Sequence, residues 1–226
     1  MNWKKDKFTI IKKAIDPDMA EFLKNYLLLK RKVLQTFMTT RYLSEFNTDW
    51  GTWKDAQVPG TYSHYADIAM ETLLTKLKPI MEKTTQTKLY ENYSYTRIYK
   101  LQDILKRHKD RFSCEISTTL NLGSDHKWPI YINPNEKEGT YNPVTKEYMP
   151  SKSKGIEVNL NPGDMLVYRG DLLEHWREEY TGNYCVQVFL HYNNKSTKGA
   201  EENALDRRPH LGLPSRFKRS ERKIPK

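Results

Sequence analysis

The sequence has only two cysteines, Cys114 and Cys185, and no apolar run long enough to cross a bilayer. Two cysteines cannot form the dense disulfide framework of small secreted domains, and their separation is not that of a zinc site. A membrane-spanning helix needs about 20 predominantly apolar residues, whereas the run Tyr26–Leu29 ends at Lys30. The charged N-terminus is not followed by the apolar segment of a secretion signal. We therefore expect a protein without membrane contact, in a reducing, cytoplasmic compartment.

The positive charge of the chain is unevenly distributed. The formal net charge is +10 over 226 residues, and residues 206–226 contain eight Lys or Arg against two acidic residues. The rest of the chain carries only about +4, which is ordinary for its size. It also lacks the basic stripe that is typical of nucleic-acid-binding surfaces. The basic character belongs mostly to the C-terminal tail.

Hydrophobic periodicity predicts a helical beginning and a strand-rich middle. Apolar residues at three- and four-residue spacing follow Asp16-Pro17-Asp18 and recur between Tyr65 and Lys83, which indicates two helices. From residue 90 the period changes to two, and strands are expected at 93–99, 114–122, 128–132, 155–160, 164–168 and 184–192. A short strand around each candidate ligand brings the total to about eight. This order predicts a β-sandwich or barrel packed against helices.

We therefore expect one mainly β domain with flanking helices, arranged in three parts. Residues 1–90 form an N-terminal helical support within the same domain, and residues 91–193 form the β core. Residues 194–226 lose periodicity and are expected to form a basic tail that is extended or disordered. The polar stretch 133–154 is expected to be a surface loop over the core.

The tripeptide His108-Lys109-Asp110 is the main chemical signal. In a strand-like segment, residues i and i+2 point to the same side, so His108 and Asp110 can bind one metal ion. A third ligand from elsewhere would complete a face of two histidines and one carboxylate, which is diagnostic of non-haem Fe(II) oxygenases. The tripeptide alone also fits a surface histidine beside an acid. His175 follows a predicted strand, and the strands between would bring it back beside the tripeptide; only His191 among the other histidines also lies in a convincing strand.

The surrounding residues extend this pattern over about residues 90–193. Four features occur in order, namely Tyr99-x8-His108-x-Asp110, Asn161-Pro162-Gly163-Asp164, Tyr168-x-Gly170, and His175 followed by a terminal strand. Together they resemble the 2-oxoglutarate- and Fe(II)-dependent oxygenases of the prolyl-4-hydroxylase-like type. A longer set of segments resembles a microbial and viral branch of that superfamily. These segments are His108–Ser117, Trp128-Pro129-Ile130, His175–Glu178 and Phe189–Tyr192.

This resemblance implies a fold, a set of ligands and an activity. The fold would be a double-stranded β-helix, a cupin-like jelly roll, supported by the N-terminal helices. Fe(II) would be held by His108, Asp110 and His175. The chain would be a dioxygenase that uses O₂ and 2-oxoglutarate, releases CO₂ and succinate, and hydroxylates an amino-acid side chain or a small molecule. The sequence leaves the substrate and the oligomeric state open.

In one respect the sequence departs from the family pattern. Relatives usually place an Arg or Lys about ten residues beyond the distal histidine, where it pairs with the C5 carboxylate of 2-oxoglutarate. Here Tyr184 and Cys185 occupy that region. Because a buried carboxylate needs a cation or several donors, another residue must take this role.

Strand parity limits the replacements. In the last strand Val186, Val188 and Leu190 are expected to face the helices, whereas Cys185, Gln187, Phe189 and His191 are expected to face the pocket. Arg177 shares a face with His175, and Arg97 shares a face with Tyr99. The candidate co-substrate contacts are Arg177 and Arg97 first, then Arg111 and Lys127, with Tyr99 and Gln187 as uncharged contacts.

Two alternatives to an oxygenase stay open. The first is a cupin-like metal-binding or interaction protein whose 2-oxoglutarate site has decayed, which the missing basic residue supports and the intact triad opposes. The second is a nucleic-acid oxidative demethylase that uses the basic tail for binding. The absence of a basic stripe outside the tail argues against it.

Overall fold

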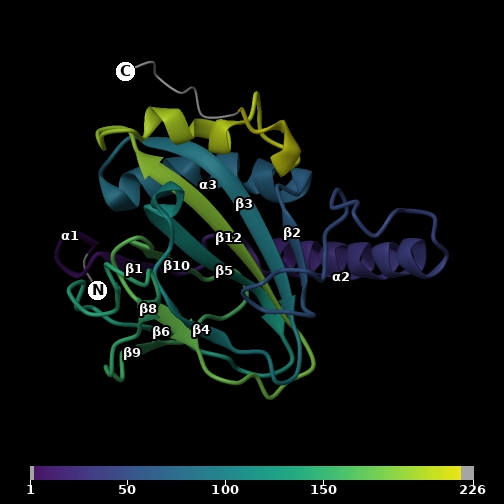
Figure 1. Ribbon diagram of the computed structural model, residues 1–226, viewed down its shortest axis with the longest axis horizontal. Helices are drawn as coiled ribbons and strands as arrows, with labels where there is room; N and C mark the ends of the chain where they lie inside the picture. Colours follow the sequence, from purple (N-terminus) through teal and green to yellow (C-terminus); the bar gives the residue numbers. More distant parts are fainter. Residues whose placement is uncertain (1–2, 220–226) are drawn as a thin grey trace.

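The computed structural model describes residues 3–219, which form two β-sheets with helices against one side of the larger sheet (Figure 1). The larger sheet is antiparallel and has the spatial order β1 (Phe8–Ile11), β10 (Met165–Tyr168), β5 (Ile116–Ser124), β12 (Cys185–Asn194), β3 (Leu89–Tyr99) and β2 (Tyr62–Tyr65). The smaller sheet has the order β4 (Leu105–His108), β11 (His175–Arg177), β6 (Ile130–Ile132) and β9 (Ile156–Val158).

The connections between the sheets define the fold. Along the chain, β3, β5, β10 and β12 join the larger sheet, and β4, β6, β9 and β11 join the smaller one. The chain therefore passes repeatedly between the sheets, and strands that are distant in sequence become neighbours. This is the jelly-roll arrangement of a double-stranded β-helix, with two open sheets instead of a closed barrel. The fold class predicted from the sequence is confirmed.

Two long helices cover the larger sheet. The first begins where the sequence predicts, whereas the second was expected from Tyr65 and begins only at Ile68, because Tyr65 ends strand β2. The helix α2 (Pro17–Thr39) has proline in its first turn, and the Asp16 side chain accepts a hydrogen bond from the backbone N–H of Asp18. The helix α3 (Ile68–Thr85) is capped by Asp67 in the same way. Within residues 3–219, no helix has the length and apolar composition needed to cross a membrane.

Alternation along β12 decides which layer each of its residues joins. As predicted, Val186, Val188 and Leu190 are buried in the core between the larger sheet and the helices, together with Leu27 of α2. Full burial of such a side chain stabilises the fold by ~1.5–3 kcal/mol.

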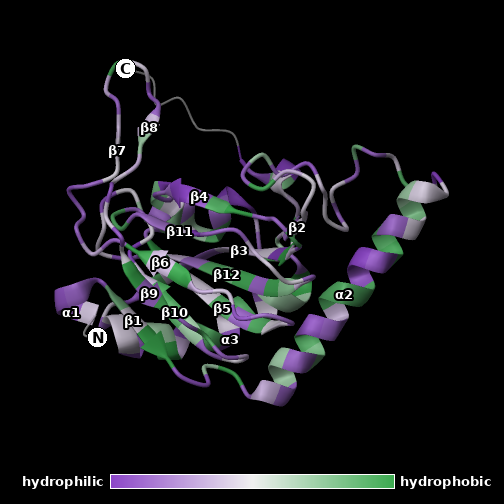
Figure 2. Ribbon diagram, turned by 90° about the horizontal axis from the view of Figure 1, so that it is seen from below, coloured by the Kyte–Doolittle hydropathy of each residue, from purple (hydrophilic) through white to green (hydrophobic). Residues whose placement is uncertain are grey.

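Two apolar residues of the helices, each part of the three- and four-residue spacing in the sequence, are exposed. Phe22 is 70% exposed and Ile68 is 71% exposed. The apolar stripe of α2 is wider than the face that the sheet covers, and Ile68 is the first residue of α3. Figure 2 shows α2 running outward past the edge of the sheets, which leaves part of its surface uncovered.

The remaining elements are short. A hairpin projects from the connection between β6 and β9 (Figure 2) and consists of β7 (Thr140–Tyr141) and β8 (Tyr148–Met149). The short helical elements are α1 (Trp3–Asp6), η1 (Phe112–Cys114), η2 (Glu201–Arg207) and η3 (Ser215–Phe217).

The C-terminal segment was expected to be extended or disordered, and this is wrong for most of its length. Its elements η2 and η3 pack against the body, and Arg208 is only 3% exposed. The Arg208 guanidinium lies 2.7 Å from the carboxylate of Glu71, itself a buried residue of α3. Composition indicated disorder, but a buried ion pair with a distant helix holds the segment. The end of the predicted tail, residues 220–226, lies outside the described residues.

Replacing Arg208 by Met should lower the free energy of unfolding by ~3 kcal/mol or more, because Glu71 would stay buried without its counter-charge. The control is Arg216→Met, which breaks an ion pair between Asp49 and an Arg216 side chain that is 57% exposed, and should change stability far less. Urea unfolding followed by tryptophan fluorescence measures both variants. Equal losses in the two would mean that the buried pair does not hold the segment.

Candidate metal centre

Strand pairing in the smaller sheet brings the predicted triad together. β4 ends at His108 and β11 begins at His175, and these two residues are direct partners across the antiparallel pair. Their imidazole rings lie 4.2 Å apart between centroids. The backbone N–H of Asp110 donates to the carbonyl of Gly170 at 2.8 Å, which fixes the loop after β4. One potential ligand atom from each of the three residues lies within 4.8 Å of the others.

Backbone carbonyls determine the tautomer of both imidazoles. His108 Nδ1 lies 2.8 Å from the carbonyl of Lys106, and His175 Nδ1 lies 2.9 Å from the carbonyl of Leu173. A carbonyl can only accept, so each ring is assigned its proton on Nδ1 and a lone pair on Nε2. These Nε2 atoms lie 3.5 and 3.6 Å from Asp110 Oδ1. The two lone pairs and the carboxylate oxygen therefore converge.

The electrostatics of the group favour the protonation states that bind a metal. Burial acts to raise the pKa of Asp110, but His175 and His108 in their protonated forms outweigh it and hold that pKa well below its usual value. Burial lowers the pKa of His175 to about 4, and the neighbouring His108 adds to the effect. At neutral pH, His175 is neutral and Asp110 is a carboxylate, as metal ligation requires.

The donor set fits one Fe(II) ion. Two neutral imidazole nitrogens and one carboxylate oxygen form the facial arrangement found in non-haem iron oxygenases, which leaves positions open for other ligands. The Gln57 side-chain amide lies 2.9 Å from His108 Nε2, where it can donate to the lone pair that an ion would use. An incoming metal would therefore replace this hydrogen bond.

The triad lies in the wall of a cavity of about 280 Å³ between the sheets. Tyr93, Tyr95 and Arg97 of β3 line the opposite side, together with Phe189 and His191 of β12. Strand parity predicted this orientation for Phe189 and His191.

Two residues of the cavity wall come from a segment that the sequence did not place near the site. Asp55 and Gln57 come from the loop before β2 and close the cavity beside Arg97. That segment, Trp50–Tyr62, has turn-like punctuation but no periodicity, so no pattern could place its side chains.

The two arginines ranked first for co-substrate binding have different surroundings. Arg97 lines the cavity, is ion-paired with Asp55, and donates to the Tyr99 hydroxyl at 3.0 Å. Arg177 is 2% exposed and lies outside the cavity lining, with its guanidinium 4.8 Å from the centroid of the Trp128 ring. It also donates to the Trp128 carbonyl.

The other candidate co-substrate contacts differ in where their side chains lie. Gln187 is buried, and its side-chain oxygen lies 3.4 Å from the Arg177 guanidinium. Lys127 is exposed and does not line the cavity. Arg111 points away from the triad and pairs with Asp206 of the C-terminal segment at 3.2 Å. The structure therefore gives no support to Lys127 or Arg111 as co-substrate ligands, because sequence adjacency did not determine where their side chains point.

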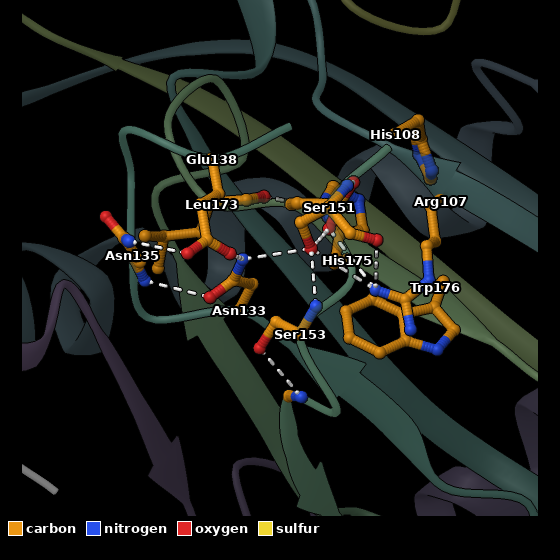
Figure 3. A network of polar contacts seen from close by, with 12 residues as sticks. Arg107, His108, Asn133, Asn135, Glu138, Ser151, Ser153, Leu173, His175 and Trp176 are labelled. Carbon is orange, nitrogen blue, oxygen red and sulfur yellow. Dashed lines mark hydrogen bonds and ion pairs between the residues drawn. The ribbon is translucent and has the colours of Figure 1, made fainter. Parts of the chain in front are cut away.

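A polar network fixes the outer side of the smaller sheet next to the histidines (Figure 3). Glu174, the residue before His175, is fully buried and accepts from the backbone N–H of Ser151 and the Tyr148 hydroxyl, both at 2.9 Å. Arg107, the residue before His108, lies 3.4 Å from the same carboxylate. The network attaches the loop 133–154 to the two strands that carry the histidines.

Comparison with known proteins finds solved structures of similar fold. Neither a family model nor a curated protein sequence matches this chain. A prolyl-4-hydroxylase from Pseudomonas putida matches in structure with a TM-score of 0.54 and 11% identity, over 86% of this chain and 96% of that one. HygX from Streptomyces hygroscopicus, solved with nickel and 2-oxoglutarate bound, gives 0.58 and 12%, over 86% and 85%.

A third match is the epimerase SnoN, solved in complex with Fe³⁺, alpha ketoglutarate and nogalamycin RO. It gives a TM-score of 0.60 at 11% identity, over 96% of this chain and 95% of that one. At such identities the likeness is one of fold. The chain has the fold of these enzymes, as the resemblance of its sequence to the 2-oxoglutarate oxygenases implied.

The metal-free protein should lose stability as the pH falls from 6.5 to about 4. In this window the unfolded chain takes up protons at His175 and His191, whereas burial lowers the pKa of each in the folded chain to about 4. Each histidine should lower the free energy of unfolding by ~1.4 kcal/mol per pH unit. Asp110 adds its own loss only below its ordinary pKa of 3.8, outside this window.

Urea unfolding at several pH values measures this slope. In the His191→Asn variant one titrating histidine is gone, so between pH 6.5 and 5, above the range of the carboxylates, the slope should fall by ~1.4 kcal/mol per pH unit. An unchanged slope would contradict the assignment of a neutral, buried His191.

Proposed function

We propose that this chain is a 2-oxoglutarate- and Fe(II)-dependent oxygenase that uses O₂ to hydroxylate an amino-acid side chain or a small molecule, with release of CO₂ and succinate. The supporting observation is the convergence of His108, Asp110 and His175 on one point of a cavity between the sheets. The spacing of these residues along the sequence predicts the same group independently. Bound Fe(II) would supply the redox chemistry that couples O₂ to oxidation of 2-oxoglutarate and substrate.

The protein's contribution is to prepare the ligands and to shape the cavity. The backbone carbonyls beside His108 and His175 hold both Nε2 lone pairs toward Asp110 before an ion arrives. On the facing side, the rings of Tyr95 and Phe189 restrict the space for solvent near the reacting position.

Arg177 is the residue we assign to the C5 carboxylate of 2-oxoglutarate. Its guanidinium lies near Cys185 and Gln187, at the start of β12, where relatives usually have their basic residue. Burial raises the pKa of the Cys185 thiol, and the nearby positive charge of Arg177 opposes that rise. The cation expected on β12 thus comes from the neighbouring part of β11.

The charge balance of the two arginines supports this assignment. The buried Nε of Arg97 and that of Arg177 both lack a hydrogen-bond partner, but within residues 3–219 only Arg97 of the two is paired with a carboxylate. A buried charge without a counter-ion is costly, so an anionic ligand would offset that cost. The charge of Arg97 is already balanced by Asp55. For the co-substrate to reach Arg177, the Trp128 ring that covers it must move aside.

The basic tail gives little support to a nucleic-acid substrate. Arg208, Arg216 and Lys218 each pair with an acidic residue inside the described part of the chain. Three of the eight basic residues of the tail are therefore ion-paired within the described structure.

Addition of Fe(II) and 2-oxoglutarate without O₂ should produce the weak visible charge-transfer band of a chelated metal. The band should be absent in His175→Ala, which removes a ligand, and present in His126→Ala, which removes an exposed histidine. Succinate formed on admission of air should follow the same pattern. Metal binding by the wild-type chain with no such band would instead indicate a metal-binding protein without this activity.

The variant Arg177→Met should bind 2-oxoglutarate about 10–100-fold more weakly while still binding Fe(II), because charge-assisted hydrogen bonds are worth ~1.5–3 kcal/mol. The variant Arg97→Lys keeps the positive charge beside Asp55 and should change this affinity far less. Titration of the charge-transfer band gives both constants. Loss of co-substrate affinity in the Arg97 variant alone would assign the carboxylate to Arg97.

A further inference from the structure

The two oxygens of the Asp110 carboxylate have different partners. Oδ1 faces the imidazoles, at 3.5 Å from His108 Nε2 and 3.6 Å from His175 Nε2. Oδ2 faces away from them and accepts a hydrogen bond from the Ser117 hydroxyl at 2.8 Å. The residue therefore offers one oxygen to the metal position and has the other occupied by the protein.

Ser117 belongs to β5, and its hydroxyl has three polar neighbours. Besides Asp110 Oδ2, the Ser117 Oγ lies 2.9 Å from the Cys114 carbonyl and 3.0 Å from His191 Nδ1. A hydroxyl has a single proton, and the charged carboxylate is the stronger acceptor. The nitrogen of His191 must then donate to Ser117, which assigns the proton of this imidazole to Nδ1.

His191 is held in place for this donation. It is 6% exposed, and its ring packs against the Tyr93 ring at 4.5 Å between centroids. The Tyr93 hydroxyl in turn lies 2.9 Å from Cys114 Sγ. Because the contact is buried, a rotation of His191 away from Ser117 would leave the Nδ1–H of His191 without an acceptor.

The main chain closes the other side of the same carboxylate oxygen. A Cβ atom on Gly170 would lie 2.3 Å from Asp110 Oδ2 and 2.5 Å from Ser117 Oγ. No side chain fits there, so only glycine lets the backbone approach this closely. The same residue provides the carbonyl that accepts from the Asp110 N–H.

From this arrangement we propose that Ser117 and His191 are positioning residues that hold Asp110 as a one-oxygen metal ligand. The proposal rests on the metal site of the proposed function and concerns how many coordination positions the protein occupies. With Oδ2 bonded to Ser117, the carboxylate can give the ion only Oδ1. The three protein ligands then fill three positions, and the remaining positions stay open for co-substrate and O₂.

Anaerobic binding of Co(II) tests the proposal, because the visible absorption of this ion depends on its coordination number. In Ser117→Ala, Oδ2 loses its donor and is free to bind the ion as well. We expect one Co(II) per chain, an affinity about 10–100-fold lower, and a changed visible spectrum. The control is Ser94→Ala, since Ser94 is a buried serine whose hydroxyl has no partner in the described structure. It should behave as the wild type.

A second pair of variants examines His191 directly. In His191→Asn the side-chain amide can donate from the place of Nδ1, so the Co(II) spectrum should be retained. In His191→Leu no donor remains, and the spectrum should move toward that of Ser117→Ala. This pair decides the question by itself if Ser117→Ala does not fold, which circular dichroism would show.

Three results would overturn the proposal. The first is an unchanged Co(II) spectrum and affinity in Ser117→Ala or in His191→Leu. The second is two Co(II) ions per wild-type chain with one lost in Cys114→Ser, since Asp110, Cys114 and His191 also lie close enough to bind an ion. The third is no Co(II) binding by the wild-type chain, which would remove the proposed function as well. Normal binding in every variant would overturn this inference alone.

Discussion

His175 lies directly opposite His108 because β11 pairs antiparallel with β4, although four other core strands separate them along the chain. This one pairing sets the distance between the imidazoles and also carries Glu174 and Arg107 to their contact on the outer side of the sheet. Asp110 then needs only the loop after β4 and the Gly170 carbonyl to complete the group. The other features of the site depend on the pairing of these two strands.

The parts of the site that could be predicted are those governed by the two-residue period of a strand. That period sorted β12 into helix-facing valines and cavity-facing Phe189 and His191. The predicted approach of Asp110 to His108 has another cause, because β4 ends at His108 and the loop after it, bonded to the Gly170 carbonyl, positions Asp110. The start of α2 could be predicted as well, since Asp16 and Pro17 act through local chemistry. Such rules depend on neighbours in sequence, so they hold wherever the element itself is regular.

The features that escaped prediction depend on contacts between distant segments. β11 has a register irregularity between His175 and Arg177, so parity could not say where the guanidinium would lie. The ion pair of Arg208 with Glu71 joins the end of the chain to α3, and nothing in the composition of the tail indicates it. The hydrogen bond between Ser117 and His191 likewise spans two strands that are distant in the sequence.

The central place of β12 has a consequence for the synthesis of the protein. β12 lies between β5 and β3, and among the strands of residues 3–219 it is the last to be synthesised. Until then β3 and β5, which hold Arg97 and Ser117, have an unpaired edge facing one another. The larger sheet therefore closes only after the other described strands of both sheets have been made, and such late, non-local pairing is typical of slow-folding β proteins whose open edges favour association.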